Sequence, residues 1–210
     1  MNGGHHFFAV TLGGRPRAWR SWLERRSFAR ADHLSAVSRY VGETTRSLLG
    51  LGDRHIEVLP NGVDTEAFRP RETPEVPGTI AFVGTLCEKK GIRQLIEAMP
   101  TVLAEHPEAH LTVAGRDWVD VDGTSFTAGL RTRMAPHLER DVEFLGPVDN
   151  DAIPDLLATA AVCVYPSHME AQGIVLVEAM AAGRAVVASS TGPGPEVIED
   201  GVSGLLCDPH

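Results

Sequence analysis

Cysteine is scarce in this sequence. Only Cys87, Cys163 and Cys207 occur among the 210 residues, and Cys163 lies inside the apolar run 161–165. An odd number of cysteines without CxxC or metal-ligand spacing indicates neither a disulfide framework nor a zinc site. This pattern favours a chain that works in the reducing cytoplasm.

Long apolar runs are missing as well. No stretch approaches the roughly 20 apolar residues that a membrane-spanning helix requires. Residues 1–8 do not combine a cationic segment with a long apolar one, so they do not resemble a secretory signal. We therefore expect a soluble, cytoplasmic protein.

Positive charge is in deficit, because 19 Lys and Arg stand against 28 Asp and Glu and the formal net charge is −9. Such a surface is not built to neutralise nucleic-acid phosphates, so we expect no nucleic-acid partner. The exception is the stretch 15–30, where six arginines stand near Trp19, Trp22 and Phe28. It predicts either a helix in peripheral contact with the anionic inner face of a membrane or a solvated helix with one buried face.

From residue 79 onward, apolar runs of strand length alternate with longer stretches of helical period. The expected strands are 79–84, 110–115, 142–145, 162–166 and 185–189, and the expected helices are 92–105, 125–138, 152–160 and 174–182. The alternation predicts an α/β domain with a Rossmann-like parallel sheet and crossover helices. The strands are nearly all apolar, which is typical of a sheet covered by helices on both faces.

The sequence divides into three segments. Residues 1–68 hold an expected strand at 31–38, a helix at 39–49 and a strand at 56–59, which is too little for a whole α/β domain. Residues 69–78 are polar and rich in proline, as in a linker. Residues 79–210 form the second domain and stop directly after a strand-like segment, so we expect both ends to continue in a longer protein.

The polar residues with the clearest chemistry lie between 165 and 183, where a buried strand ends, a turn follows and a helix begins. Ligands of open α/β sheets bind beyond the carboxyl ends of the strands, and a helix N-terminus offers unpaired N–H groups to an anion. Gly173 allows a diphosphate to approach the backbone closely. Glu170 and Glu178 are suitable acceptors for sugar hydroxyls, although two glutamates at this spacing are also typical of solvated helix charges.

This turn resembles the E-x7-E region of family 4 glycosyltransferases through Pro166, Ser167, Glu170, Gly173, Glu178-Ala179-Met180-Ala181 and Gly183. Other stretches agree with that family in order and spacing: Ala31-Asp32-His33, Ala36-Val37-Ser38, Pro60-Asn61-Gly62-Val63-Asp64 with Phe68, Phe82-Val83-Gly84, Lys90-Gly91, Gly192, Glu196, Asp200-Gly201 and Gly204-Leu205-Leu206.

The resemblance implies a GT-B fold, in which two Rossmann-like domains face each other across a cleft and the C-terminal domain binds the nucleotide-activated sugar. Residues 1–68 then end the N-terminal, acceptor-side domain, and residues 79–210 form a nearly complete donor-binding domain. The resemblance also implies transfer with retention of the anomeric configuration, without an essential metal or other cofactor.

The resemblance further implies roles for single residues. Glu170 contacts hydroxyls of the transferred sugar near the reacting carbon, and Glu178 binds the ribose of the donor. Backbone N–H groups around Gly173 and Ile174 hold sugar or phosphate oxygens. Lys90 neutralises the diphosphate, on which charge builds up in an oxocarbenium-like transition state.

The sequence departs from the family at one position. The family usually has an arginine directly after the glycine that ends the first strand of this domain, whereas this chain has Thr85 after Gly84. Lys89 either compensates for the missing cation or is a solvated residue at the start of a helix. Arg116 follows the strand 110–115 and either approaches the nucleotide or has a structural or solvent role. We include these four residues in the predicted donor site.

Two further motifs have competing interpretations. Asp120-Val121-Asp122 matches the metal-binding DxD of the other main glycosyltransferase fold, but it lies in the polar loop 117–123 and we predict no metal there. Glu196 follows the turn Gly192-Pro193-Gly194-Pro195. It either lies near the cleft or interacts with the dipole of the helix that it begins.

The leading hypothesis is transfer of a hexose-type sugar from a nucleoside diphosphate sugar to an acceptor, which is a lipid-linked sugar, a polysaccharide or a small metabolite. One alternative is a donor-binding fragment without catalytic activity. The other is a related GT-B enzyme, either a sugar-nucleotide epimerase or a phosphorylase.

Overall fold

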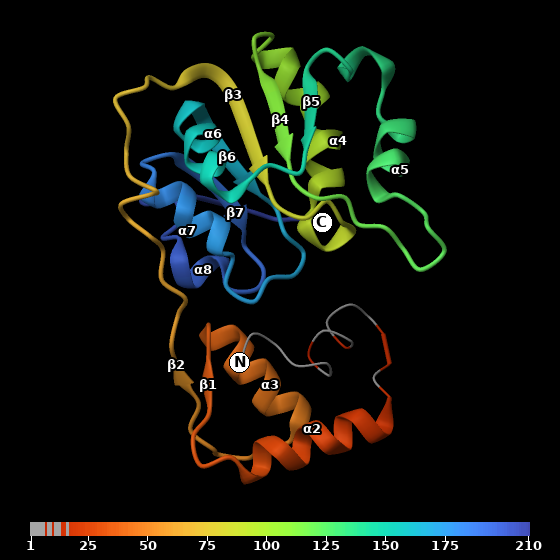
Figure 1. Ribbon diagram of the computed structural model, residues 1–210, viewed down its shortest axis with the longest axis vertical. Coiled ribbons are helices and arrows are strands. Elements are labelled where there is room, and N and C mark those ends of the chain that lie inside the picture. Colours follow the sequence, from red (N-terminus) through yellow and green to blue (C-terminus); the bar gives the residue numbers. More distant parts are fainter. Residues whose placement is uncertain (1–6, 8–9, 11–13, 16) are drawn as a thin grey trace.

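The computed structural model describes residues 7, 10, 14–15 and 17–210. Residues 1–6, which open the stretch tested for a secretory signal, lie outside the described residues. Figure 1 shows a large α/β part built from the later residues and a smaller part built from the N-terminal ones, joined by the extended segment that follows β2.

The large part contains a sheet of six parallel strands in the order β5-β4-β3-β6-β7-β8. Their bounds are β3 (Val76–Val83), β4 (His110–Ala114), β5 (Val142–Gly146), β6 (Ala160–Tyr165), β7 (Ala185–Ser189) and β8 (Leu205–Cys207). The predicted parallel sheet is therefore confirmed. The chain order reverses between β3 and β6, and ligands of open α/β sheets bind beyond the strand ends at such a switch point.

Helices cover both faces of this sheet. They are α4 (Ile92–Glu105), α5 (Phe126–Arg133), α6 (Ile153–Thr159), α7 (Ile174–Ala181) and the short α8 (Gly194–Val197). In β3, Ala81 and Val83 belong to the core that contains α6 and α7, whereas Ile80 and Phe82 belong to the core that contains α4 and α5. Side chains alternate between the faces of a strand, so an all-apolar strand requires cover on both sides.

Two bounds in the large part differ from the predictions by three residues or more. The strand β3 begins at Val76, so the last three residues of the predicted linker 69–78 belong to the sheet. The helix predicted at 125–138 ends at Arg133, and a separate 3-10 turn follows at Pro136–Leu138. Met134 and Ala135 are extended, because proline disfavours the helical conformation in the residue before it and has no N–H to donate.

The N-terminal part contains α2 (Ala18–Arg30), β1 (Ser35–Ala36), α3 (Arg39–Leu49) and β2 (Glu57–Val58), with β1 and β2 parallel. The strand β1 is much shorter than the segment 31–38 predicted for it. Helix α3 begins after Ser38, whose hydroxyl accepts the N–H of Val41, and it ends at Gly50, whose φ of 58° lies in the left-handed region.

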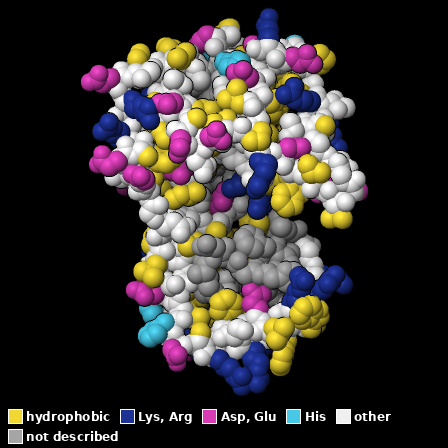
Figure 2. Space-filling model, viewed as in Figure 1, with side chains coloured by type: hydrophobic (Ala, Val, Ile, Leu, Met, Phe, Trp, Pro, Cys, Tyr) yellow, Lys and Arg dark blue, Asp and Glu magenta, His cyan; other side chains and the backbone are white. Residues whose placement is uncertain are grey.

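Helix α2 lies at the surface of the N-terminal part. None of its residues is fully buried, and Trp19 and Trp22 are 56% and 58% exposed. Only Phe28 packs into a small core, which contains Leu34, Leu49 and Leu51. Figure 2 shows Lys and Arg side chains beside hydrophobic ones over this part of the molecule. None of the helices in the described part of the chain is long and apolar enough to cross a bilayer.

Candidate functional site

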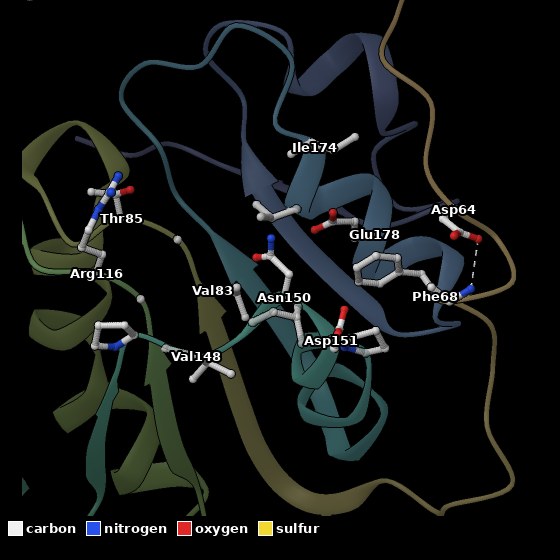
Figure 3. Close-up of a pocket in the computed structure, with 18 of the residues that line it drawn as sticks. Asp64, Phe68, Val83, Thr85, Arg116, Val148, Asn150, Asp151, Ile174 and Glu178 are labelled. Atoms are coloured by element: carbon white, nitrogen blue, oxygen red, sulfur yellow. Dashed lines mark hydrogen bonds between the residues drawn. The ribbon is translucent and has the colours of Figure 1, made fainter.

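A cavity of about 720 Å³ lies beyond the carboxyl ends of β3 and β4, next to the switch point of the sheet. Five residues predicted for the donor site line it together: Gly84, Thr85, Arg116, Ile174 and Glu178. In Figure 3, Thr85 and Arg116 lie on one side of this cavity, Asp64 and Phe68 lie on the opposite side, and Glu178 lies between them. Residues of both predicted domains therefore line this cavity.

Glu178 belongs to the second turn of α7, between apolar neighbours that pack into the core below it. Burial raises the pKa of this carboxyl group above its ordinary value. The cause is that the charged form loses hydration in the cavity wall. A carboxylate in this setting gains more from accepting hydrogen bonds than one on an open surface.

The N-terminus of α7 is the second feature of the cavity. Gly173 precedes the helix with a φ of 78°, a conformation that favours glycine, and no side chain caps the helix there. The first N–H groups of a helix have no partner within it and carry the positive end of its dipole. An oxygen of a sugar or a phosphate is the kind of acceptor that these groups fit.

Lys90 and Glu170 form a direct ion pair through Lys90 Nζ and Glu170 Oε1. The two side chains are 19% and 22% exposed, and Ser167 Oγ donates to the same carboxylate oxygen at 3.3 Å. The sequence predicted both residues for the site but not their pairing. Since Glu170 already neutralises Lys90, a diphosphate at this position must share the ammonium group with the carboxylate.

Glu170 and Gly173 border a second, small cavity beside the main one, together with Ser167 and Gln172. Val175 lines both cavities, so α7 separates them. The structure therefore places the two predicted carboxylates on adjoining cavities rather than in one.

Lys89 lies in the 3-10 turn Glu88–Lys90 and does not line the main cavity. Its backbone carbonyl accepts the N–H of Met169 at 3.2 Å, which ties this turn to the segment before Glu170. Arg116, in contrast, lines the cavity near Thr85 (Figure 3). Arg116, which follows the neighbouring strand β4, thus places a cation near Thr85, where the family usually has an arginine. Arg71 also lines the cavity and pairs with Asp155.

Sequence reasoning missed five polar or aromatic residues of the cavity wall: Asp64, Phe68, Arg71, Asn150 and Asp151. Asp64 holds its own turn, because its carboxylate accepts the N–H groups of Glu66 and Ala67. Asp64 and Phe68 belong to a stretch that the sequence marked by resemblance without a role. Asn150 and Asp151 follow β5, and their position after a strand is the only feature of the sequence that could have indicated a place in the site.

Asp120 and Asp122 are engaged within their own exposed loop. Their carboxylates accept hydrogen bonds from Trp118 Nε1 and from the N–H of Thr124, both at 3.0 Å. In the part of the chain that the structure describes, no group of three or more His, Cys, Asp or Glu side chains is arranged to hold a metal ion.

Comparison with protein families gives two matches that together cover most of the chain. A family model described as glycosyl transferases group 1 matches residues 77–210, and one described as glycosyltransferase family 4 matches residues 4–67. The boundary between the matches falls in the segment 68–76, close to the predicted linker.

Curated relatives and solved structures agree with these matches. Glycogen synthase of Mycobacterium tuberculosis is 32% identical over 95% of this chain and 46% of its own length, and a phosphatidyl-myo-inositol mannosyltransferase of the same organism is 38% identical over 74% and 40%. Sucrose-phosphate synthase of Thermosynechococcus elongatus superposes with a TM-score of 0.81 at 25% identity, over 98% of this chain and 54% of that one.

An Anabaena protein, HepE, solved in complex with UDP and glucose, superposes with a TM-score of 0.74 at 25% identity, over 91% of this chain and 53% of that one. The chain spans about half the length of the relatives that it matches.

Proposed function

Because this chain belongs to the family 4, group 1 glycosyltransferases, we propose that it forms the donor-binding half of an enzyme that transfers a sugar from a nucleoside diphosphate sugar with retention of configuration. The observation that carries this proposal is the cavity at the strand ends, with the Glu178 carboxylate and the uncapped start of α7 on its wall. Vicinal hydroxyls of a ribose donate to a carboxylate, and phosphate oxygens accept from helix N–H groups.

In this proposal the donor extends from the main cavity toward Glu170. Glu178 binds the ribose, Ile174 and Gly173 hold phosphate or sugar oxygens, and Arg116 replaces the usual arginine as the cation beside the nucleotide. Lys90 stabilises the negative charge that builds up on the leaving diphosphate as the bond to the anomeric carbon breaks. Glu170 orients both Lys90 and the hydroxyls of the transferred sugar.

The names of the relatives suggest where to begin. UDP occupies the solved Anabaena relative, so a UDP-sugar is the first donor to test. The relatives are named for glycogen, sucrose phosphate and a phosphatidyl-inositol, which supports an acceptor that is a sugar, a lipid-linked group or a small molecule. Transfer assays should use the complete product of the reading frame, here called the full-length protein.

Glu178 offers the first test of donor binding. Titration calorimetry is expected to show binding of a UDP- or GDP-sugar, and Glu178→Gln is expected to weaken it by about 10- to 100-fold, the value of a hydrogen bond to a charged group. Binding to the wild-type chain should also weaken as the pH falls through the raised pKa of Glu178, because the protonated group is a poorer acceptor. Glu199→Gln, at an exposed position, is the control.

Thermal unfolding of the same variant separates binding from folding. The pKa of Glu178 is higher in the folded state than in the unfolded state, so ionisation of Glu178 reduces the stability of the fold. The whole loss is present at a pH above the raised pKa, and none of it is present at a pH below the ordinary pKa. Glu178→Gln should therefore unfold at a higher temperature than the wild type at pH 7, and this gain should vanish in acid. Donor binding that is equally tight in both proteins would refute the assignment.

A transfer assay run beside calorimetry distinguishes the alternatives. Donor binding without turnover by the full-length protein supports a binding module. Release of an epimerised donor, or a requirement for inorganic phosphate, supports an epimerase or a phosphorylase.

We also propose that α2 contacts an anionic membrane surface. The support is the pair of exposed tryptophans beside arginines, with Arg20 lying over the ring of Trp19 and Arg26 over that of Trp22. Aromatic side chains partition into the interface, and each nearby arginine adds about 1 kcal/mol of attraction to anionic lipid.

Sedimentation with vesicles tests this contact. The full-length protein should pellet with phosphatidylglycerol vesicles more than with phosphatidylcholine vesicles, less so at high salt, and Trp22→Ala should reduce the bound fraction severalfold. Trp118→Ala, at a tryptophan that is 52% exposed in the large part, is the control. Equal pelleting with both lipids would argue for a merely solvated helix.

A further inference from the structure

The turn between Glu170 and Gly173 is bonded to the N-terminal part through two successive residues. Ser38 Oγ donates to the carbonyl oxygen of Ala171 at 2.6 Å. The side chain of Gln172 accepts the N–H of Asn61 at 2.7 Å and donates to the carbonyl oxygen of Asn61 at 3.0 Å. Three hydrogen bonds thus attach two residues of the turn to two separate segments of the other part.

The two side chains that make these bonds are buried, whereas Asn61 is exposed. Ser38 and Gln172 are 3% and 7% exposed, and the neighbouring Met169 is buried in one cluster with Val37 and Val41 of the N-terminal part. A buried polar group that loses its partner bears the full cost of desolvation. The turn therefore cannot leave the N-terminal part without exposing apolar surface and leaving polar groups without partners.

Glu196 adds a third attachment. Its carboxylate accepts the N–H groups of Arg39 and Tyr40, the first two residues of α3, at 2.7 and 2.6 Å. The interpretation of Glu196 as a charge at the start of its own helix was incomplete, because α8 spans only four residues and the carboxylate caps α3 instead. A negative charge at the N-terminus of α3 is favourable for the same electrostatic reason.

We propose that Ser38 and Gln172 are positioning residues of the donor site. Ala171 and Gln172 separate Glu170, which pairs with Lys90, from Gly173, which begins α7. Fixing the two middle residues fixes both ends of the turn. The placement of Glu170 and of the first N–H groups of α7 therefore depends on docking of the N-terminal part.

This inference rests on the proposed function for its catalytic consequence. A donor bound by Glu170, Gly173 and Ile174 favours the docked arrangement, and docking favours the donor by the same free energy, because coupling between two sites is reciprocal. The donor cavity and the N-terminal part are thereby linked without the donor touching Ser38 or Asn61.

Hydrogen exchange of the full-length protein tests the attachment without any donor. Gln172→Met preserves the length of the side chain and removes both of its hydrogen-bonding atoms, Oε1 and Nε2, so amide exchange in residues 58–64 and 167–175 should quicken at least fivefold. Gln94→Met, in α4 and outside this contact, is the matched control. Glu196→Gln serves as a second variant and should quicken exchange at Arg39 and Tyr40, with Glu199→Gln as its control.

Kinetics tests the consequence. Gln172→Met should lower kcat by about tenfold, as expected for a small misplacement of a catalytic group. It should also raise the donor KM, because docking of the N-terminal part favours donor binding. A lower Tm with kcat within twofold of the wild-type value would show a merely structural role and overturn the inference. Unchanged exchange in 58–64 would also overturn it. Failure of any donor to bind, with the exchange effect intact, would refute the proposed function instead.

Discussion

Lys90→Ala is expected to lower kcat for sugar transfer by about 100- to 1000-fold, the usual effect of removing one group that stabilises charge in a transition state. Lys90 is largely shielded from water and pairs with Glu170, whose carboxylate also accepts a hydrogen bond from Ser167. A fixed charge in such a setting stabilises a developing negative charge more strongly than a mobile surface lysine. The measurement is steady-state transfer by the full-length protein at saturating donor.

The neighbouring lysine is the matched control. Lys90 makes the ion pair with Glu170, and Lys89 lies beside it in the same 3-10 turn, so Lys89→Ala should change kcat by no more than a few fold. Glu170→Gln should lose activity on the scale of Lys90→Ala, and the double variant should lose much less than the product of the single losses, because paired groups act as a unit. Activity of Lys90→Ala close to that of Lys89→Ala would remove Lys90 from the proposed mechanism.

Gly91→Ala is expected to cost roughly 2–4 kcal/mol of the free energy of unfolding, the sum of over-packing and of a left-handed backbone. Gly91 joins the 3-10 turn to α4 with a φ of 69°, and a Cβ there would lie 1.9 Å from the carbonyl oxygen of Pro166. Both obstacles are backbone, so the side chains cannot relieve them. Since Pro166 begins the segment that leads to Glu170, transfer activity should fall together with stability.

Thermal and urea unfolding measure this cost. The loss corresponds to a decrease in Tm of roughly 5–15 °C for a chain of this size. Gly129→Ala is the control, because Gly129 lies in α5 with open space around its Cα and should gain up to about 1 kcal/mol from alanine. A Gly91→Ala variant as stable as the wild type would show that Pro166 moves freely.

The class of fold was predictable because it depends on patterns that are local in the sequence. Strand runs such as 110–115 and helix runs such as 92–105 match β4 and α4 closely, and family comparison confirmed the resemblance that Glu170 and Glu178 suggested. The wrongly predicted bounds of α5 and β3 also had local causes. Pro136 ended a helix that the apolar pattern extended, and β3 began inside the linker.

The arrangement of the site was only partly predictable. Gly84, Thr85, Arg116, Ile174 and Glu178 lie together because residues that follow parallel strands meet at one edge of the sheet. The order of the strands does not follow from the sequence, and it decides that Arg116 from β4 lies beside Thr85. The sequence therefore included Arg116 among the candidate donor residues but left its role open, and the strand order places it beside Thr85.

By itself, then, the sequence determined the parallel α/β architecture, the family and the residues of the E-x7-E turn, because hydrophobic periodicity and short motifs are properties of neighbouring residues. Only the tertiary structure decided that Lys90 pairs with Glu170, that Glu196 caps α3 and that Gln172 holds Asn61. These partners are 80, 156 and 111 residues apart. Contacts at such separations depend on how whole elements pack, and no local pattern records that packing.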